Sequence, residues 1–144
     1  MFLDALRETG VQRLLDVRQR RGVRGSEYAW ANARRLETAV TAAGIDYRHE
    51  KQLAPTTELR RLQYAEDDRL GVGKRSRVVL ADVYRERYLR EILDEADRDG
   101  IARELRSGLG ALLCVERDPE ACHRSLAADR LADELGVRVV HLRP

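Results

Sequence analysis

The chain has 144 residues, of which 43% are hydrophobic and 36% are charged. This length fits one compact domain over residues 1–144, and the apolar content excludes an intrinsically disordered chain. The 27 basic residues nearly balance the 25 acidic residues, so the overall charge by itself does not indicate nucleic acid or membrane as a partner. We expect a cytoplasmic protein that binds no membrane, because no apolar run is long enough to span a bilayer and the first residues lack the pattern of a signal peptide.

The spacing of apolar residues and the positions of glycines predict helices that alternate with short strands. In the first half these signals predict a short helix stopped by Gly10, a strand over 11–17, a basic loop over 19–25, a helix over 31–43 and a strand over 45–49. In the second half they predict a loop over 51–57, a polar helix over 58–70, a mainly helical stretch over 76–96 that continues at 101–105, a strand over 108–115, a helix over 122–135 and a final strand over 137–142.

This alternation is typical of an α/β protein with a mainly parallel sheet. Helices would cover both faces of the sheet, which predicts a three-layer sandwich. In such sheets ligands bind beyond the carboxyl ends of the strands, so the residues that follow each strand are the candidates for a functional site.

Polar and reactive side chains follow three of the predicted strands. They are Asp16 and Arg18 after the first strand, Tyr47 in the second, and Cys114, Glu116, Cys122, His123 and Arg124 at and after the third. Asp118 is a natural N-cap and Pro119 fits the first helical position, which would place the Cys-His-Arg segment in the opening turns of a helix. Free N–H groups and the helix dipole would favour an anion or a thiolate there.

The pattern Cys-x-Glu-x5-Cys-His-Arg over 114–124 resembles a motif of the family catalogued as domain of unknown function 488. In that family a strand ending in Cys-x-Glu leads through an Asp-Pro loop into Cys-His-Arg, and earlier segments carry Asp-Val-Arg and a Tyr-containing strand, which match 16–18 and Tyr47 here. The resemblance spans nearly the whole chain and implies a fold and a site rather than a reaction.

The resemblance also implies a difference at the start of the chain. Family members usually open with a strand of the type Thr-Ile-Gly-His-Ser before the first helix, whereas this sequence begins inside that helix. We therefore expect the N-terminal strand of the family to be absent, which would expose an apolar edge of the sheet. A homodimer could cover that edge.

Two residues are candidates for catalysis. Cys122 is the candidate nucleophile, because a helix N-terminus and the neighbouring His123 and Arg124 would lower the pKa of its thiol. The alternative for Cys122 is a small buried packing residue. Glu116 follows a buried strand, where an unpaired carboxylate would be costly, so it either transfers protons, binds a metal or pairs with an arginine. We expect Cys114 to be mainly a core residue.

The remaining candidates would bind substrate. Arg18 and Arg124 would hold an anionic group, with Asp16 orienting Arg18, and the set is completed by Tyr47 and His123. Because adjacent residues on a helix point about a quarter-turn apart, Cys122 and His123 could both face one atom only with strain, and only one of them needs to face the pocket. The basic loop with Arg20, Arg21, Arg24, Tyr28 and Trp30 would either bind phosphates and bases or form a solvated surface.

These residues leave three functions open, and they do not settle whether the protein is an enzyme or which cofactor it uses. The first is an enzyme that acts on a phosphorylated, nucleotide-like or nucleic-acid substrate. The second is a noncatalytic module that binds an anion, nucleic acid or a partner protein. The third is a metal-binding protein that uses its Cys, His and Glu side chains. The Cys-x7-Cys spacing disfavours a metal site because structural zinc sites typically use Cys-x2-Cys. A disulfide between Cys114 and Cys122 would require their Cα atoms to approach within about 7 Å.

Overall fold

The structure is a computed structural model that describes residues 2–24, 26–73, 76–114 and 119–142. Its described residues contain three short strands, which form one sheet: β1 (Arg13–Asp16), β2 (Asp46–His49) and β3 (Gly110–Leu113). The strand order is β2-β1-β3 and both pairings are parallel. The carboxyl ends of all three strands therefore meet at one edge of the sheet, with β1 in the centre.

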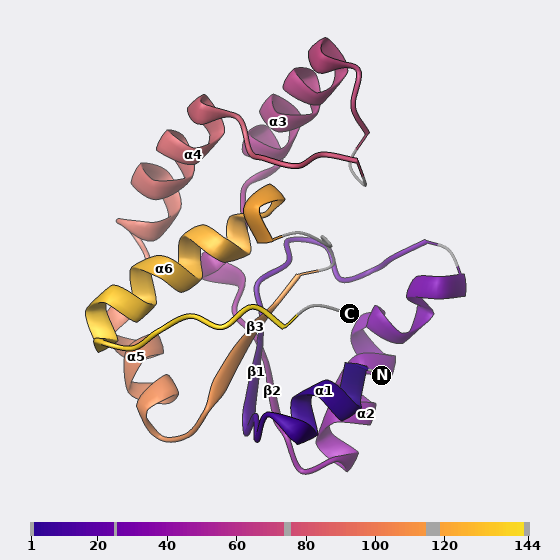
Figure 1. Ribbon diagram of the computed structural model, residues 1–144, viewed down its shortest axis with the longest axis vertical. Coiled ribbons are helices and arrows are strands. Elements are labelled where there is room, and N and C mark those ends of the chain that lie inside the picture. The colour runs from indigo at the N-terminus through magenta and orange to yellow at the C-terminus, as the bar shows by residue number, and fades with distance from the viewer. Residues whose placement is uncertain (1, 25, 74–75, 115–118, 143–144) are drawn as a thin grey trace.

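Helices lie on both sides of this sheet, which confirms the predicted α/β sandwich (Figure 1). On one side lie α1 (Phe2–Glu8) and α2 (Ala33–Ala42), and on the other lie α3 (Thr57–Leu70), α4 (Asp82–Tyr88), α5 (Arg98–Arg106) and α6 (His123–Leu135). Short turns of helix occur at Ser26–Ala31, Lys51–Leu53, Leu89–Leu93 and Pro119–Ala121. No helix in the described ranges is both long and apolar enough to cross a bilayer.

The alternating side chains of β1 and of Val17, the residue that follows it, pack against both helical layers. Leu14 packs with apolar residues of α1 and α2, whereas Leu15 and Val17 pack with apolar residues of α3, α4, α5 and α6. This separation follows from the geometry of a strand, in which successive side chains point to opposite faces. All three side chains are buried, so the central strand is fixed from both sides just before the residues that follow it.

The predicted helix ends at Gly71 and Gly136 are confirmed. Gly71 ends α3 with φ 70° and Gly136 ends α6 with φ 67°, both in the left-handed region. Glycine adopts this conformation without the steric cost that a Cβ atom would add. At its other end α3 is capped by the Thr56 side chain, which accepts a hydrogen bond from the Leu59 backbone N–H over 3.1 Å.

The helix predicted over 76–96 begins later than expected, at Asp82. The residues just before α4 instead make contacts outside their own segment. The Arg77 guanidinium binds the Asp67 carboxylate of α3, and the Ala81 backbone N–H donates to the Gln63 side chain over 2.9 Å. These tertiary contacts outweigh the local helical periodicity, and they hold the chain against α3.

The prediction of a final strand over 137–142 is wrong. This segment follows α6 as an extended chain without strand pairing, and Figure 1 shows it as a coil. Its alternating apolar pattern is typical of a half-buried strand, but Val137 is 59% exposed and Val140 is 73% exposed. A strand is stabilised by hydrogen bonds to a neighbour, and within the described residues the sheet ends at β3 on this side.

Candidate active site at the strand ends

A cavity of about 100 Å³ lies at the carboxyl ends of β1 and β3. Its walls include four arginines, both cysteines of the chain and one histidine: Arg18, Arg20, Arg60, Arg77, Cys114, Cys122 and His123. Pockets that enclose whole drug-sized ligands usually measure roughly 300–1,000 Å³. This cavity therefore fits one small group, such as a phosphate, with the rest of a larger ligand outside.

The start of α6 differs from the prediction in a way that changes the site. Pro119–Ala121 forms a separate turn, α6 begins at His123, and Cys122 occupies the N-cap position with an extended backbone (φ −137°, ψ 142°). The Cys122 sulfur accepts a hydrogen bond from the backbone N–H of Arg124 over 3.4 Å. The proposed N-cap at Asp118 lies outside the described residues. The thiol thus lies directly at the helix N-terminus, where unpaired N–H groups and the helix dipole favour negative charge.

Cys122 and His123 face one another, whereas two adjacent helical residues were expected to face one atom only with strain. The distance between Cys122 Sγ and His123 Nδ1 is 3.6 Å, and both residues line the cavity. The expectation used the geometry of two helical residues, but Cys122 precedes the helix and its extended backbone turns the sulfur toward the ring. Exposed fractions of 2% for Cys122 and 6% for His123 show that the pair is largely shielded from bulk water.

The central strand fixes the orientation of the His123 ring. His123 Nε2 lies 2.8 Å from the backbone carbonyl oxygen of Val17, directly after β1. A carbonyl oxygen only accepts hydrogen bonds, so Nε2 carries the hydrogen of this bond. This leaves Nδ1 as the atom that faces the Cys122 sulfur. The arrangement is therefore able to move a proton from the thiol to the imidazole.

Asp16, Arg18 and Tyr47 form a buried network beside this pair. The Arg18 guanidinium donates to both Asp16 carboxylate oxygens, over 2.8 Å from Nε and 2.7 Å from Nη2, and to the Ala31 carbonyl over 2.7 Å. The Tyr47 hydroxyl donates to Asp16 Oδ2 over 2.5 Å. Burial alone would raise the pKa of Asp16, but the bonds from Arg18 and Tyr47 and the Arg18 charge outweigh it and hold the pKa below its ordinary value. The carboxylate orients the arginine, whose three donor groups are all bound to protein.

A family model described as Domain of unknown function DUF488 matches residues 1–131. The chain belongs to this family. Comparison with curated proteins finds no match, and comparison with solved structures finds none either. Membership of DUF488 confirms the resemblance, and the description of the family names no reaction.

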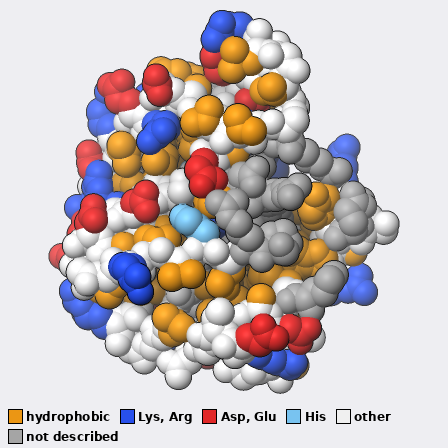
Figure 2. All heavy atoms as spheres, viewed as in Figure 1, with side chains coloured by type: hydrophobic (Ala, Val, Ile, Leu, Met, Phe, Trp, Pro, Cys, Tyr) orange, Lys and Arg blue, Asp and Glu red, His pale blue; other side chains and the backbone are white. Residues whose placement is uncertain are grey.

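The charges around the cavity of this DUF488 chain are unevenly paired. Figure 2 shows basic and acidic side chains interspersed over one face of the molecule, so any attraction for an anion is local. Arg77 pairs with Asp67 over 2.7 Å, as Arg18 does with Asp16.

Arg60 instead binds two neutral groups, the Gln19 side chain over 2.7 Å and the Tyr64 hydroxyl over 2.9 Å. Within the described ranges neither Arg60 nor Arg20 forms an ion pair, so both add uncompensated positive charge.

No local signal in the sequence singles out Arg60 and Arg77. Arg60 lies on the polar helix α3, where an arginine looks like an ordinary surface residue, and Arg77 lies in the segment whose helix was predicted too early. Arg77 also donates from Nη1 to the carbonyl oxygen of Ala121 over 3.0 Å, immediately before Cys122. Its role depends on partners 10 and 44 residues away in the sequence, which no local pattern reveals.

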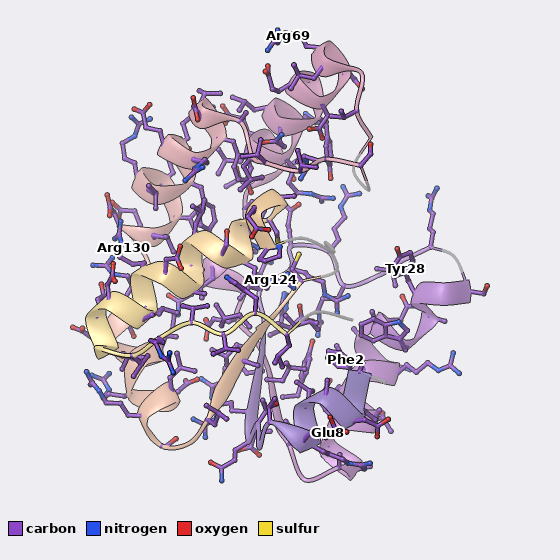
Figure 3. The ribbon with its side chains drawn as sticks, viewed as in Figure 1. Phe2, Glu8, Tyr28, Arg69, Arg124 and Arg130 are labelled. Atoms are coloured by element: carbon purple, nitrogen blue, oxygen red, sulfur yellow. The ribbon has the colours of Figure 1, made fainter. Side chains whose placement is uncertain are left out.

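A further predicted residue, Arg124, lies near the end of β3. Arg124 donates from Nη1 to the carbonyl oxygen of Cys114 over 3.1 Å, and Figure 3 places it on α6 beside that strand. Glu116, the predicted proton-transfer residue, lies outside the described residues, so its role stays a prediction.

The described residues also hold one group of potential metal ligands. The side-chain ligand atoms of Cys114, Cys122 and His123 all lie within 4.8 Å of one another. Cys114 is half-buried and belongs to the wall of the same cavity. The two thiols and the imidazole come from the end of β3 and the start of α6, so the fold brings together donors that are separated in sequence.

Proposed function

We propose that this DUF488 protein is an enzyme that transfers a phosphoryl group from a small phosphorylated or nucleotide-like substrate to the thiolate of Cys122. The observation that carries the proposal is the position of the Cys122 sulfur at the N-terminus of α6, 3.6 Å from His123 Nδ1, in a cavity lined by arginines. A nucleophile, a base and positive charge are the groups that such a reaction requires.

Local structure around Cys122 favours the thiolate over the thiol. The sulfur accepts the Arg124 backbone N–H at the first turn of α6, a helix of 13 residues whose dipole favours negative charge at this end. His123 Nδ1 is placed to accept the proton, and the resulting imidazolium would further stabilise the sulfur anion. These interactions support Cys122 as the nucleophile.

The cationic wall supports a phosphate as the group that the cavity receives. Arg60 and Arg20 bring positive charge that no carboxylate of the described residues neutralises, and guanidinium groups bind phosphate through two parallel hydrogen bonds. In this proposal Arg18, which Asp16 and Tyr47 hold in place, forms the wall of the cavity on the strand side. The cavity volume of about 100 Å³ suits one phosphate rather than a whole nucleotide.

The proposed reaction has two steps. The Cys122 thiol gives its proton to His123, the thiolate forms a bond to phosphorus, and the bond from phosphorus to the leaving oxygen breaks as that oxygen takes up the proton. Water then attacks the phosphocysteine, which breaks the bond between sulfur and phosphorus and releases inorganic phosphate. Glu116 would assist by accepting the proton of that water. The arginines would stabilise the charge on the equatorial oxygens during both steps.

The second candidate is a noncatalytic module that binds an anion, and the same arginines favour it. Arg18 and Arg77 are held by carboxylates, whereas Arg60 and Arg20 remain available to a ligand whether or not Cys122 reacts. The two candidates differ in the behaviour of the thiol. A binding module keeps its ligand affinity when Cys122 is replaced and forms no covalent intermediate.

The test is a panel of phosphate monoesters, nucleoside phosphates and a short oligonucleotide, screened first by thermal shift and then for phosphate release. A ligand that binds only the folded state raises the melting temperature, so binding is detected without knowing the reaction. We expect hits that the wild-type chain hydrolyses, a phosphorylated Cys122 in acid-quenched samples, and no phosphate release by Cys122→Ser. Serine retains a side-chain oxygen that can cap α6, so the variant separates loss of the nucleophile from loss of the cap. Equal turnover by Cys122→Ser would contradict the proposal, and binding without turnover by either chain would favour the binding module.

A further inference from the structure

We propose that Cys114, Cys122 and His123 form a binding site for a zinc ion, with the two Sγ atoms and His123 Nδ1 as the ligands. The existence of this site does not depend on the proposed phosphoryl transfer, because it rests on the positions of three donor atoms that lie within 4.8 Å of one another.

The distances between the donors suit tetrahedral zinc. Bonds of about 2.3 Å to sulfur and about 2.0–2.1 Å to nitrogen place a sulfur and a nitrogen ligand about 3.6 Å apart, and two sulfur ligands about 3.8 Å apart. The distance from Cys122 Sγ to His123 Nδ1 is 3.6 Å. Cys114 Sγ lies within 4.8 Å of both Cys122 Sγ and His123 Nδ1. To reach the separations expected around zinc, each of these two distances needs to shorten by at most about 1 Å.

The orientation of His123 is a second and independent feature of a metal ligand. A histidine that binds a metal through one ring nitrogen typically donates the other N–H to a carbonyl or carboxylate, which fixes the tautomer and the ring. Here the Val17 carbonyl oxygen accepts from Nε2 over 2.8 Å, and Nδ1 faces the sulfur of Cys122. The backbone after the central strand therefore holds the ring in the ligating orientation.

The donor types select the class of metal. Two thiolates and one imidazole suit zinc, whereas calcium and magnesium prefer oxygen ligands. Three protein ligands leave one tetrahedral position for water or for an anionic group in the arginine-lined cavity. The Cys-x7-Cys spacing does not argue against this site, because that rule describes ligands on one short loop. Here Cys114 follows β3 and Cys122 caps α6.

Zinc at this site would control the proposed reaction. A thiolate that shares its lone pair with zinc is not free to attack phosphorus, so the metal would inhibit an enzyme that uses Cys122. This consequence, unlike the site itself, rests on the proposed function. Cys114 would then be the residue that makes the nucleophile sensitive to zinc without taking part in the reaction.

The experiment titrates reduced, metal-free protein with zinc in competition with a chromophoric chelator, and repeats the titration with cobalt(II) as a spectroscopic probe. We expect about one zinc per chain and a cobalt spectrum with the sulfur-to-metal charge-transfer band and intense visible absorption of a tetrahedral thiolate site. Cys114→Ser is expected to lose at least about tenfold in zinc affinity, because even partners that only support a ligand contribute that much.

Two controls make the result decisive. His141→Ala removes the exposed histidine of the C-terminal segment and should bind zinc as the wild type does. Circular dichroism of Cys114→Ser checks that the variant is folded, and alkylation of its remaining thiol reports whether the pair of Cys122 and His123 is intact. Absence of zinc binding by the wild type, or equal binding by folded Cys114→Ser, would overturn the zinc site. Zinc binding together with a Cys122 that is unreactive even in the metal-free protein would instead contradict the proposed function and leave the metal site standing.

Discussion

The sulfur of Cys122 and the Nδ1 atom of His123 lie 3.6 Å apart because the cysteine caps the helix that the histidine begins. The extended backbone of the cap residue turns two neighbouring side chains toward the same point.

The reactivity of Cys122 should depend on His123. In a Cys114→Ser background, which leaves a single thiol, we expect alkylation by iodoacetamide to titrate with a midpoint below about 8.5, the pKa of an unperturbed cysteine. His123→Gln retains a side-chain amide that can donate to the Val17 carbonyl but has no imidazole to accept the thiol proton. We expect about a tenfold lower rate at neutral pH, which corresponds to a shift of about one pKa unit. An unchanged rate, with His141→Ala as the control, would show that His123 does not activate the thiol.

Asp16 should matter greatly for stability. Asp16→Asn removes the charge that compensates buried Arg18, and breaking one side of a buried pair costs about 3–5 kcal/mol. The matched control is Asp46→Asn, which removes an exposed carboxylate 3.5 Å from Arg13 and should cost no more than about 1 kcal/mol. Urea denaturation of the three chains measures both free energies of unfolding. Similar values for the two variants would contradict the structural role of Asp16.

Asp16 should also make stability depend on pH. Its pKa is lower in the folded protein than in the unfolded chain, so the unfolded state binds the proton more readily. The stabilisation is therefore complete above the unfolded pKa of about 3.9 and is lost as the pH falls through the lower folded value. The free energy of unfolding of the wild type should decrease between about pH 5 and pH 2 more steeply than that of Asp16→Asn. Parallel curves would assign the acid sensitivity to other carboxylates.

Anion binding should depend on Arg60 and not on arginines in general. Arg60→Gln removes a cation from the cavity wall, and charge-assisted hydrogen bonds contribute about 1.5–3 kcal/mol, so we expect roughly a tenfold or greater loss of affinity for a phosphorylated ligand. Arg69→Gln is the control on the same helix, because Arg69 lies at the far end of α3 and pairs with Glu66 (Figure 3). Calorimetric titration of both variants compares them. Equal losses would indicate a general charge effect instead of a site.

The sequence was sufficient to predict the parts of the fold that local signals determine. Gly71 and Gly136 mark helix ends because their left-handed backbone favours glycine, and the buried apolar run at 11–17 contains the central strand. The rule that ligands bind beyond strand ends also selected the region of the cavity, which is lined by Arg18, Cys122 and His123.

Features that depend on distant partners could not be predicted in this way. The segment before α4 is not helical because Arg77 binds Asp67 and the carbonyl oxygen of Ala121, and neither contact has a local signal. The apolar alternation over 137–142 predicts a strand only if a neighbour is available to pair with it. The cap position of Cys122 depends on the turn at Pro119–Ala121: α6 begins at His123 and not at Pro119, and this start decides which side chains meet.

The acceptor that holds the His123 ring is the main-chain oxygen of Val17. A side-chain acceptor disappears with a single substitution, whereas a main-chain oxygen is present whatever residue occupies the position. Residue 17 is therefore free to vary in identity, within the limits of packing, without loss of the ring's alignment. A variant that keeps His123 and the path of the backbone at residue 17 therefore keeps the imidazole ring in the same orientation.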